Sequence, residues 1–135
     1  DDFAPVRIRA IEGIGRIRKK GADYLAYALL DNIVDGYYEV MDAIQEQLFE
    51  LEETLHRNGA EPEVKAGIFS LKRTVNDFRF RVLPLRDAAT RLYRTDSNLI
   101  DESSRLYLRD VVDHVAQILD SIDNQLNMLV EIIHL

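Results

Sequence analysis

The stretch that decides the expected fold runs from Val64 to Leu92 and reads VKAGIFSLKRTVNDFRFRVLPLRDAATRL. Its apolar residues recur at alternating gaps of three and four: Val64, Ile68, Leu71, Val75, Phe78, Val82, Leu85, Ala89 and Leu92. An average spacing of 3.5 residues keeps one side of a helix turned toward a partner over many turns, as in coiled coils. The stretch therefore predicts a long helix with a continuous buried seam.

Two further stretches repeat this pattern on either side of the first. The earlier one contains Tyr27, Leu30, Val34, Tyr37, Met41, Ile44, Leu48, Leu51 and Leu55. The later one contains Leu108, Val112, Val115, Leu119, Ile122, Leu126, Leu129 and Ile133. Helices of roughly 30 to 40 residues are about 45–60 Å long, because each residue adds about 1.5 Å. We therefore predict an all-α fold in which a long antiparallel hairpin and a third long helix, called the stalk helix below, form a coiled-coil-like three-helix bundle.

Turn residues divide the chain into three parts. Residues 1–20 predict a short basic helix and linker, since Gly13 and Gly15 break any longer helix. Residues 21–98 predict the hairpin, with Asp23 as N-cap of its first helix. Asn58-Gly59 ends that helix, and Pro62 opens the second one. So short a connection forces an antiparallel arrangement.

Residues 99–135 predict the first part of the stalk helix, with Asp101 or Ser97 as its cap. The apolar pattern is still in phase at the end of the chain, so we expect a parent protein that continues. In the isolated chain, the turns from Leu129 onward are expected to fray or to pack on another copy.

The bulk composition is that of a folded, helix-rich protein. The chain has 135 residues, of which 47% are apolar and 30% charged, and it contains no cysteine. It has no uncharged apolar run of about 18 residues that would span a bilayer, and no signal peptide is recognisable at its start. The net charge of −7 argues against a general nucleic-acid binder, which needs a basic face.

Charge is segregated along the chain. The first hairpin helix is acidic, the second is basic and the stalk helix is acidic again. We expect the acidic and basic helices to be electrostatically matched, although exposed ion pairs contribute only ~0–1 kcal/mol each. Burial of the apolar seams must then supply most of the stability.

Two groups of side chains could bind a divalent cation. Asp31 and Asp35 are four residues apart and share one helix face, where carboxylate oxygens suit Mg²⁺ or Ca²⁺. Asp110, Asp113 and His114 form a second group on the stalk helix, with Asp110 and His114 at the i, i+4 spacing. Each group is also explained without a metal, as a solvated face or as partners for arginines of the basic helix.

Other patterns are weaker. Glu131 and His134 form one E-x-x-H pair, whereas di-iron bundles need two such pairs and further glutamates. The tyrosines of the first hairpin helix are better explained by packing than by a ligand pocket. The chain has no P-loop, no Rossmann glycine fingerprint and no G-x-S-x-G sequence. Nothing in the sequence argues for an enzyme.

Three stretches together resemble the cytoplasmic part of CorA-type divalent-cation transporters. The first is GADYLAYALLDNIVDGYY at residues 21–38, and the second is RVLPLR at residues 81–86. The third is YLRDVVDH at residues 107–114, similar to the opening of the family's stalk helix. They occur in the family's order and separations, and together they cover essentially the whole chain.

The resemblance implies a homopentameric funnel on the cytoplasmic face of the cell membrane, regulated by weakly bound Mg²⁺ or Co²⁺ between subunits. By motif, Asp110 corresponds to the principal stalk-helix ligand, with His114 nearby, and Asp31 to a second site, with Asp35 a weaker candidate. The family's α/β domain, which supplies a partner carboxylate, is absent here, as are the membrane segments and the glycine–methionine–asparagine motif. The chain is then a gating fragment that reaches the membrane only through C-terminal segments it lacks.

Two alternatives come from other classes of protein. One is a soluble metal-binding helical-bundle regulator of the PhoU type, which also places acidic residues four apart. The other is a structural coiled-coil scaffold without a ligand. The sequence identifies neither the transported ion nor the direction of transport.

Overall fold

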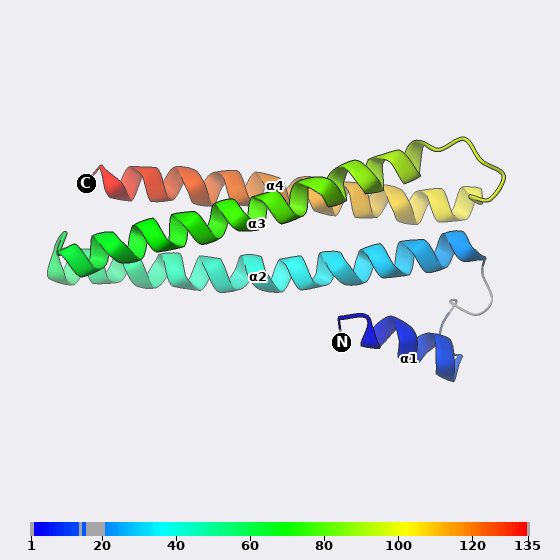
Figure 1. Ribbon diagram of the computed structural model, residues 1–135, viewed down its shortest axis with the longest axis horizontal. Helices are drawn as coiled ribbons and strands as arrows, with labels where there is room; N and C mark the ends of the chain where they lie inside the picture. Colours follow the sequence, from blue (N-terminus) through cyan, green and yellow to red (C-terminus); the bar gives the residue numbers. More distant parts are fainter. Residues whose placement is uncertain (1, 14, 16–20, 135) are drawn as a thin grey trace.

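The computed structural model describes residues 2–13, 15 and 21–134. Within them lie four helices, α1 (Ala4–Glu12), α2 (Ala22–Asn58), α3 (Pro62–Arg94) and α4 (Glu102–Ile133). α2, α3 and α4 lie side by side along the long axis of the molecule, and α1 lies beside the N-terminal part of α2 (Figure 1). The predicted all-α fold, with its hairpin, stalk helix and short N-terminal helix, is confirmed. The predicted basic linker at residues 16–20 lies outside the described residues.

The turn between α2 and α3 is formed by Gly59 and Pro62, as predicted from the sequence. Gly59 ends α2 with a φ of 76°, and its N–H donates to the carbonyl oxygen of Leu55. Such a positive φ is easily adopted by glycine, because it has no Cβ. Pro62 occupies the first turn of α3, where its missing N–H would have had no helical partner. The 37-residue α2 and the 33-residue α3 are thereby folded back on one another.

The start of α2 corrects one prediction. Gly21 is the N-cap, with an extended backbone, and Asp23 lies inside the first turn. The Asp23 carboxylate accepts hydrogen bonds from the backbone N–H of Tyr24 and from the backbone N–H of Asp101. The assignment of Asp23 as N-cap of α2 is therefore wrong. Gly21 holds that position, and the second carboxylate oxygen of Asp23 binds the start of α4 instead.

The seams of α2 and α3 pack as predicted. Every predicted seam position of α3 from Val64 to Ala89 is buried. In α2, Val34, Ile44 and Leu48 are buried, and the other seam residues pack against the same core. Each apolar side chain that is fully removed from water contributes about 1.5–3 kcal/mol, so this continuous core dominates the stability.

The buried stripe of α4 is wider than its predicted seam. Leu108, Val115, Ile122 and Leu129 are 0% exposed, as predicted. Val111 and Ile118 are also 0% exposed, whereas the predicted Val112 and Leu126 are only half-buried. α4 contacts both α2 and α3, so a second line of residues is turned inward. Periodicity located the stripe but not its width.

A polar side chain lies in the middle of this core. Gln125 of α4 is 3% exposed, and its Nε2 donates to the carbonyl oxygen of Met41 and to Oε1 of Gln45, each at 3.3 Å. Its own Oε1 is buried and has no hydrogen-bond partner. A buried unsatisfied oxygen costs about 1–3 kcal/mol, whereas a single polar core residue can fix the register of packed helices.

The last turns of α4 pack on the chain's own hairpin, which corrects the expectation for the turns after Leu129. Leu129 is 0% and Ile132 is 7% exposed, and both belong to the main core. The end of α4 lies beside the α2–α3 turn (Figure 1). The hairpin is long enough to cover the whole of α4, so no second copy is needed to bury these residues.

The charges of α2 and α3 do not pair with each other. Among the described residues, the ion pairs are Arg79–Asp123, between α3 and α4, and Arg86–Asp87, within α3. Both pairs are exposed enough to contribute little. The predicted electrostatic matching of the two hairpin helices is therefore not found in the described part of the chain, because their facing sides are occupied by the apolar seams.

Candidate functional site

Asp31 of α2 lies within electrostatic reach of Asp110 and His114 of α4. Burial is the largest influence on the half-buried Asp31 and raises the pKa of its carboxyl group. Repulsion by Asp35 and, more weakly, by Asp110 also raises this pKa, while His114 and Arg9 act to lower it. A carboxylate that is partly desolvated among other carboxylates is unfavourable in its charged form. In such an environment, a nearby cation stabilises the charged form of the carboxylate.

Among the predicted ligands, Asp110 is exposed, and so are Asp35 and Asp113. Asp35 is exposed, four residues after Asp31, and acts on it through repulsion. Asp113, which directly precedes His114 in α4, is also exposed. Of the predicted residues, Asp35, His114 and Asp110 act on Asp31, in that order of strength, and Asp113 is not among the groups that act most strongly on it. In the described residues, no three histidine or acidic side chains have the geometry to hold a metal ion by themselves.

Three tyrosines form one end of this site. The rings of Tyr24, Tyr27 and Tyr107 lie 5.0 to 5.5 Å apart, with Tyr24 and Tyr107 edge to face. Burial, followed by repulsion from Asp31, raises the pKa of Tyr27 to about 12. Tyr27 thus stays neutral beside the carboxylates. The interpretation of these rings as packing residues agrees with their place between α2 and α4.

Two neighbours of the site had not been predicted as part of it. Tyr38 packs its ring on His114, with the centroids 6.1 Å apart, and its hydroxyl donates to Oε1 of Gln117 at 3.1 Å. Arg9 of α1 acts on Asp31 by electrostatic attraction. The spacing of Tyr38 from the α2 seam could have indicated a second contact with α4. No spacing could have indicated Arg9, because it lies on a separate helix.

The site is positioned by a link between the starts of α2 and α4. Oδ2 of Asp23 accepts a 2.8 Å hydrogen bond from the backbone N–H of Asp101, the N-cap of α4. This bond, together with a hydrogen bond from Ser104, lowers the pKa of Asp23. It sets α4 against α2 only a few turns before Asp110 meets Asp31.

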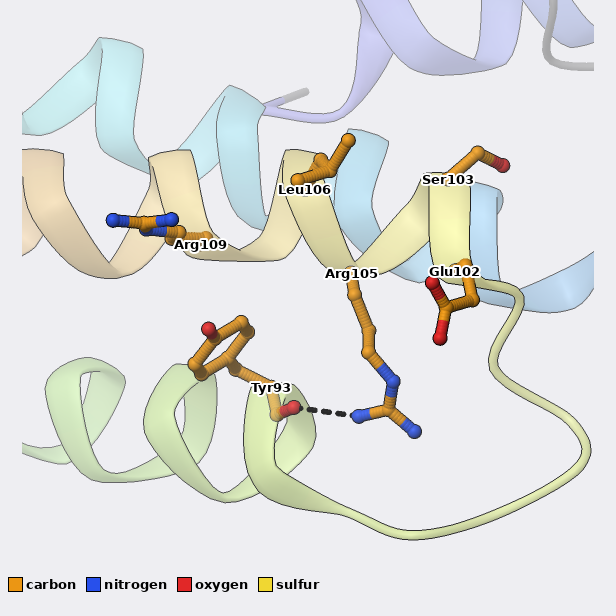
Figure 2. Close-up of a pocket in the computed structure, with 6 residues that line it drawn as sticks. All are labelled: Tyr93, Glu102, Ser103, Arg105, Leu106 and Arg109. Carbon is orange, nitrogen blue, oxygen red and sulfur yellow. Dashed lines mark hydrogen bonds between the residues drawn. The ribbon is translucent and has the colours of Figure 1, made fainter.

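The corner between α3 and α4 contains a hollow of about 300 Å³, shown in Figure 2. Arg105 crosses it and donates to the carbonyl oxygens of Tyr93 and Thr95, at 2.8 and 2.7 Å. These carbonyls belong to the end of α3, so Arg105 satisfies groups that a helix terminus leaves open. The guanidinium therefore stabilises this corner between α3 and α4. No nucleophile and base are paired among the residues that line the hollow.

The E-x-x-H pair at the end of α4 does not form a metal centre. Glu131 and His134 are both exposed, and they line different hollows beside the hairpin turn. The inward-facing ligands of a di-metal bundle are thus not assembled by these two residues. Of the helices described, none combines the length and the apolar character needed to cross a bilayer.

Comparison with known proteins places these features in one family. The model of a family described as CorA-like Mg²⁺ transporter protein matches residues 7–134. The chain is 39% identical, over 123 residues, to the cobalt/magnesium transport protein CorA of Thermotoga maritima. It is 25% identical, over 113 residues, to the putative metal ion transporter YfjQ of Bacillus subtilis.

The fold also matches a solved transporter. The CorA magnesium transporter from Methanocaldococcus jannaschii superposes with a TM-score of 0.78 over 85% of this chain, at 23% sequence identity. That match covers 36% of the solved chain. The matches to the two curated relatives cover 91% and 83% of this chain but 35% of each relative. The chain thus spans about a third of the length of these proteins.

Proposed function

The chain belongs to the CorA-like Mg²⁺ transporter family, and from this premise we propose that it is the helical gating region of a divalent-cation transporter. In this proposal the α2–α4 face with Asp31, Asp110 and His114 senses divalent cations at a boundary between subunits. The assembly is a homopentamer at the cytoplasmic face of the membrane, and its activity is transport, without enzymatic catalysis. Family membership favours this function over a PhoU-like regulator or a bare scaffold.

The observation that supports the proposal is the incompletely compensated charge at Asp31. Its carboxyl group is half-buried, its pKa is raised, and neither it nor Asp110 makes an ion pair within the described residues. Burying a charged group without a partner is costly, so proteins retain such a group where it has a function. A structural role alone would be served better by an amide or an apolar residue at this position.

The donor set fits a hard cation but is incomplete. Carboxylate oxygens are preferred by Mg²⁺, which keeps several of its waters and is usually held by one or two carboxylates. Asp31 and Asp110 would supply those oxygens, and His114 would adjust the local charge. When bound, a divalent cation supplies the positive charge that makes neighbouring carboxylates tolerable. The remaining ligands would come from another subunit or from parts of the protein outside this chain.

α4 provides the route from the site to the far end of the bundle. It is one continuous helix of 32 residues, about 48 Å long at the usual rise per residue. Asp110 lies near its start, and its far end lies beside the hairpin turn. A change in the repulsion between subunits at the site would therefore tilt α4 as a rigid rod. Binding that favours one arrangement stabilises it in proportion to occupancy.

The proposal is tested with Mn²⁺ as a paramagnetic probe of the 135-residue chain. We expect amide resonances around Asp31, Asp110 and His114 to broaden first, with an affinity of about 1 mM or weaker because ligands are missing. Asp31→Asn and Asp110→Asn are each expected to weaken binding by at least about tenfold. Asp120→Asn, which removes an exposed carboxylate from the same helix, is the matched control.

Two results would contradict the proposal. One is broadening centred on the outer acidic face of α2, around Glu46 and Glu53, with no effect of Asp31→Asn. The other is ion binding that the Asp120→Asn control weakens as much as Asp110→Asn does. Calorimetry that gave sub-millimolar Mg²⁺ binding, abolished by Asp110→Ala, would instead show that the chain alone holds a complete site.

A further inference from the structure

A phenylalanine between two acidic residues is exposed on the outer face of α2. Phe49 is 59% exposed. Glu46 precedes it by three residues and Glu53 follows it by four, so the three side chains share one face of the helix. Both glutamates are exposed, and neither makes an ion pair within the described part of the chain. We call these three residues the acidic triplet.

α3 carries the opposite arrangement. Phe69 is 54% exposed and lies four residues after Lys65 and three residues before Lys72. These three side chains also share one helix face. Lys65 is exposed and Lys72 half-buried, and among the described residues neither lysine makes an ion pair. We call these three residues the basic triplet.

The basic triplet borders a hollow of about 410 Å³ between the start of α3 and the end of α4. Phe69 and Lys65 line this hollow together with Ile132 and Ile133 of α4. Phe49 is not part of its lining. Buried aromatic rings in apolar pockets, with charged residues around them, are the usual anchors of protein interfaces. The hollow therefore suits an aromatic ring that has acidic neighbours.

Two contacts fix the level of α2 relative to α3, which run side by side in opposite directions (Figure 1). A Cβ placed on Gly67 would lie 3.0 Å from Cδ2 of Leu51, so these two residues are level with each other. Farther from the turn, the hydroxyl of Tyr37 donates to the backbone oxygen of Arg81 at 3.1 Å. Both contacts give the same register, because each step back along α2 corresponds to one step forward along α3.

This register places the two triplets at the same levels of the bundle. The level pairs are Glu53 with Lys65, Phe49 with Phe69, and Glu46 with Lys72. The gaps of three and four residues follow each other in opposite order in the two triplets, as antiparallel pairing requires. Within the described chain, no ring contact and no ion pair joins one triplet to the other.

We propose that the acidic triplet of one copy of this chain docks on the basic triplet of a second copy, with Phe49 entering the hollow beside Phe69. Copies that stand side by side in the same orientation keep their levels, so all three pairs form without a shift along the bundle. The contact joins two different surfaces, and each copy therefore retains one surface for a further neighbour. Contacts of this kind build rings.

This inference rests on the assembly of copies in the proposed function and adds the surfaces through which the copies meet. The two rings are already half-buried, and exposed charge pairs contribute little. We therefore expect the 135-residue chain to associate weakly, with a Kd of about 0.1–1 mM. High ionic strength should weaken the association, because it screens the charge pairs.

The first test uses cysteine cross-linking, because the chain has no cysteine of its own. Glu53→Cys and Lys65→Cys chains are mixed and oxidised slowly, and mass spectrometry measures the mixed and the like disulfide products. We expect the mixed product to exceed either like product by about tenfold, since only this pair of positions comes within disulfide reach. Both phenylalanines stay in place.

Glu39→Cys mixed with Lys65→Cys is the matched control for cross-linking. Glu39 is an exposed glutamate of α2, about 21 Å from Glu53 along the helix. We expect no excess of the mixed product in this control. An equal excess in both mixtures would overturn the proposed register.

The second test measures self-association by sedimentation equilibrium. We expect Phe49→Ser to weaken association by about tenfold, because it removes the ring that fills the hollow. Phe80→Ser is the matched control, since Phe80 is a 74% exposed phenylalanine of α3 that does not line the hollow. The control should stay within about twofold of the unmodified chain. Circular dichroism checks that both variants are folded.

A charge exchange tests the pairing of Glu53 with Lys65. Glu53→Lys is expected to weaken association by about 3–10-fold at low ionic strength, and adding Lys65→Glu should restore it. Adding Arg94→Glu gives the same net charge but changes an exposed residue at the other end of α3. We expect no restoration in that combination. Equal restoration by both would overturn the pairing, because only net charge would then matter.

The outcomes separate this contact from the sensor site. A chain that stays monomeric up to about 1 mM, without excess mixed product, would overturn the contact, while Mn²⁺ bound at Asp31 would leave the sensor standing. Excess mixed product without Mn²⁺ at Asp31 would support the contact and overturn only the sensor. Predominance of like products from Glu53→Cys would indicate a two-fold contact and overturn the proposal. So would a monomer that binds phosphatidylserine vesicles through Phe69 and not through Phe49.

Discussion

The carboxylate of Asp23, in the first turn of α2, accepts a 2.8 Å hydrogen bond from the backbone N–H of Asp101, the N-cap of α4. The two residues are separated by 78 positions in the sequence. Their bond joins the helix that carries Asp31 to the helix that carries Asp110. It therefore helps to set the positions of the two acidic residues relative to each other along the bundle.

Replacing Asp23 tests this link. We expect Asp23→Ala to lower the free energy of unfolding by about 1 kcal/mol, the usual cost of losing a helix-capping side chain. Urea denaturation followed by circular dichroism measures the change. Asp96→Ala, which removes an exposed carboxylate from the loop between α3 and α4, should stay within about 0.5 kcal/mol of the unmodified chain. Equal losses in both variants would show that the bond to Asp101 contributes nothing specific.

The same carboxylate predicts a pH dependence. Hydrogen bonds from Asp101 and Ser104 lower the pKa of Asp23 in the folded chain. The unfolded chain then binds the proton more readily, so the contribution of Asp23 is complete above about pH 4 and is lost as the pH falls through its folded pKa. Stability curves measured from pH 6 to pH 2 should fall less steeply for Asp23→Ala than for the unmodified chain.

Asp31 is expected to act in the opposite direction. Its pKa is raised by burial and by Asp35, so ionisation favours the unfolded chain, and stability falls as the pH rises from about 4 through the folded pKa. We therefore expect Asp31→Asn to stabilise the chain at pH 7 by about 0.5 kcal/mol, after allowance for solvent screening. Thermal unfolding at pH 7 and at pH 3.5 measures this. A gain that persists at pH 3.5 would show that packing, and not charge, is responsible.

Gln125 offers a test of the core. We expect Gln125→Leu to raise the free energy of unfolding by about 1 kcal/mol or more, because it removes a buried oxygen that has no partner. Gln125→Ala should instead destabilise the chain, because it leaves a cavity. Urea denaturation distinguishes the two. Strong destabilisation by leucine would mean that a bound water satisfies Oε1, because leucine would remove a hydrogen-bond partner of that buried water.

The matched pair Val111 and Val112 tests which side of α4 is buried. Val111 is 0% exposed, whereas Val112 is half-buried. We expect Val111→Ala to lower the free energy of unfolding by about 2 kcal/mol, and Val112→Ala to lower it by less than about 1 kcal/mol. If the order of these losses were reversed in denaturation experiments, α4 would be rotated from its described position.

The comparison of expectation and structure is clearest at α4. Its predicted seam is correct at Leu108, Val115, Ile122 and Leu129, because a helix repeats its direction every seven residues whatever it packs against. The adjoining line through Val111 and Ile118 was missed, because it is buried only when a helix has two partners. Gln125 lies on that line, so its burial could not be foreseen either.

The candidate site divides in the same way. The i, i+4 spacings placed Asp31 with Asp35, and Asp110 with His114, since these are local properties of one helix. The meeting of Asp31 with Asp110 depends on the contact between α2 and α4, which only the resemblance to a family had suggested. The electrostatic effect of Arg9, from the separate helix α1, had no indication in spacing at all.

The sequence by itself determined the long helices and the hairpin turn between two of them, because the apolar period and turn residues such as Gly59 and Pro62 act over a few neighbouring positions. The tertiary structure decided which residues face which helix, that Asp23 also binds the start of α4, and that Arg9 acts on Asp31. These contacts join residues far apart in the chain. Their energies exist only after packing brings the partners together, and no local pattern encodes them.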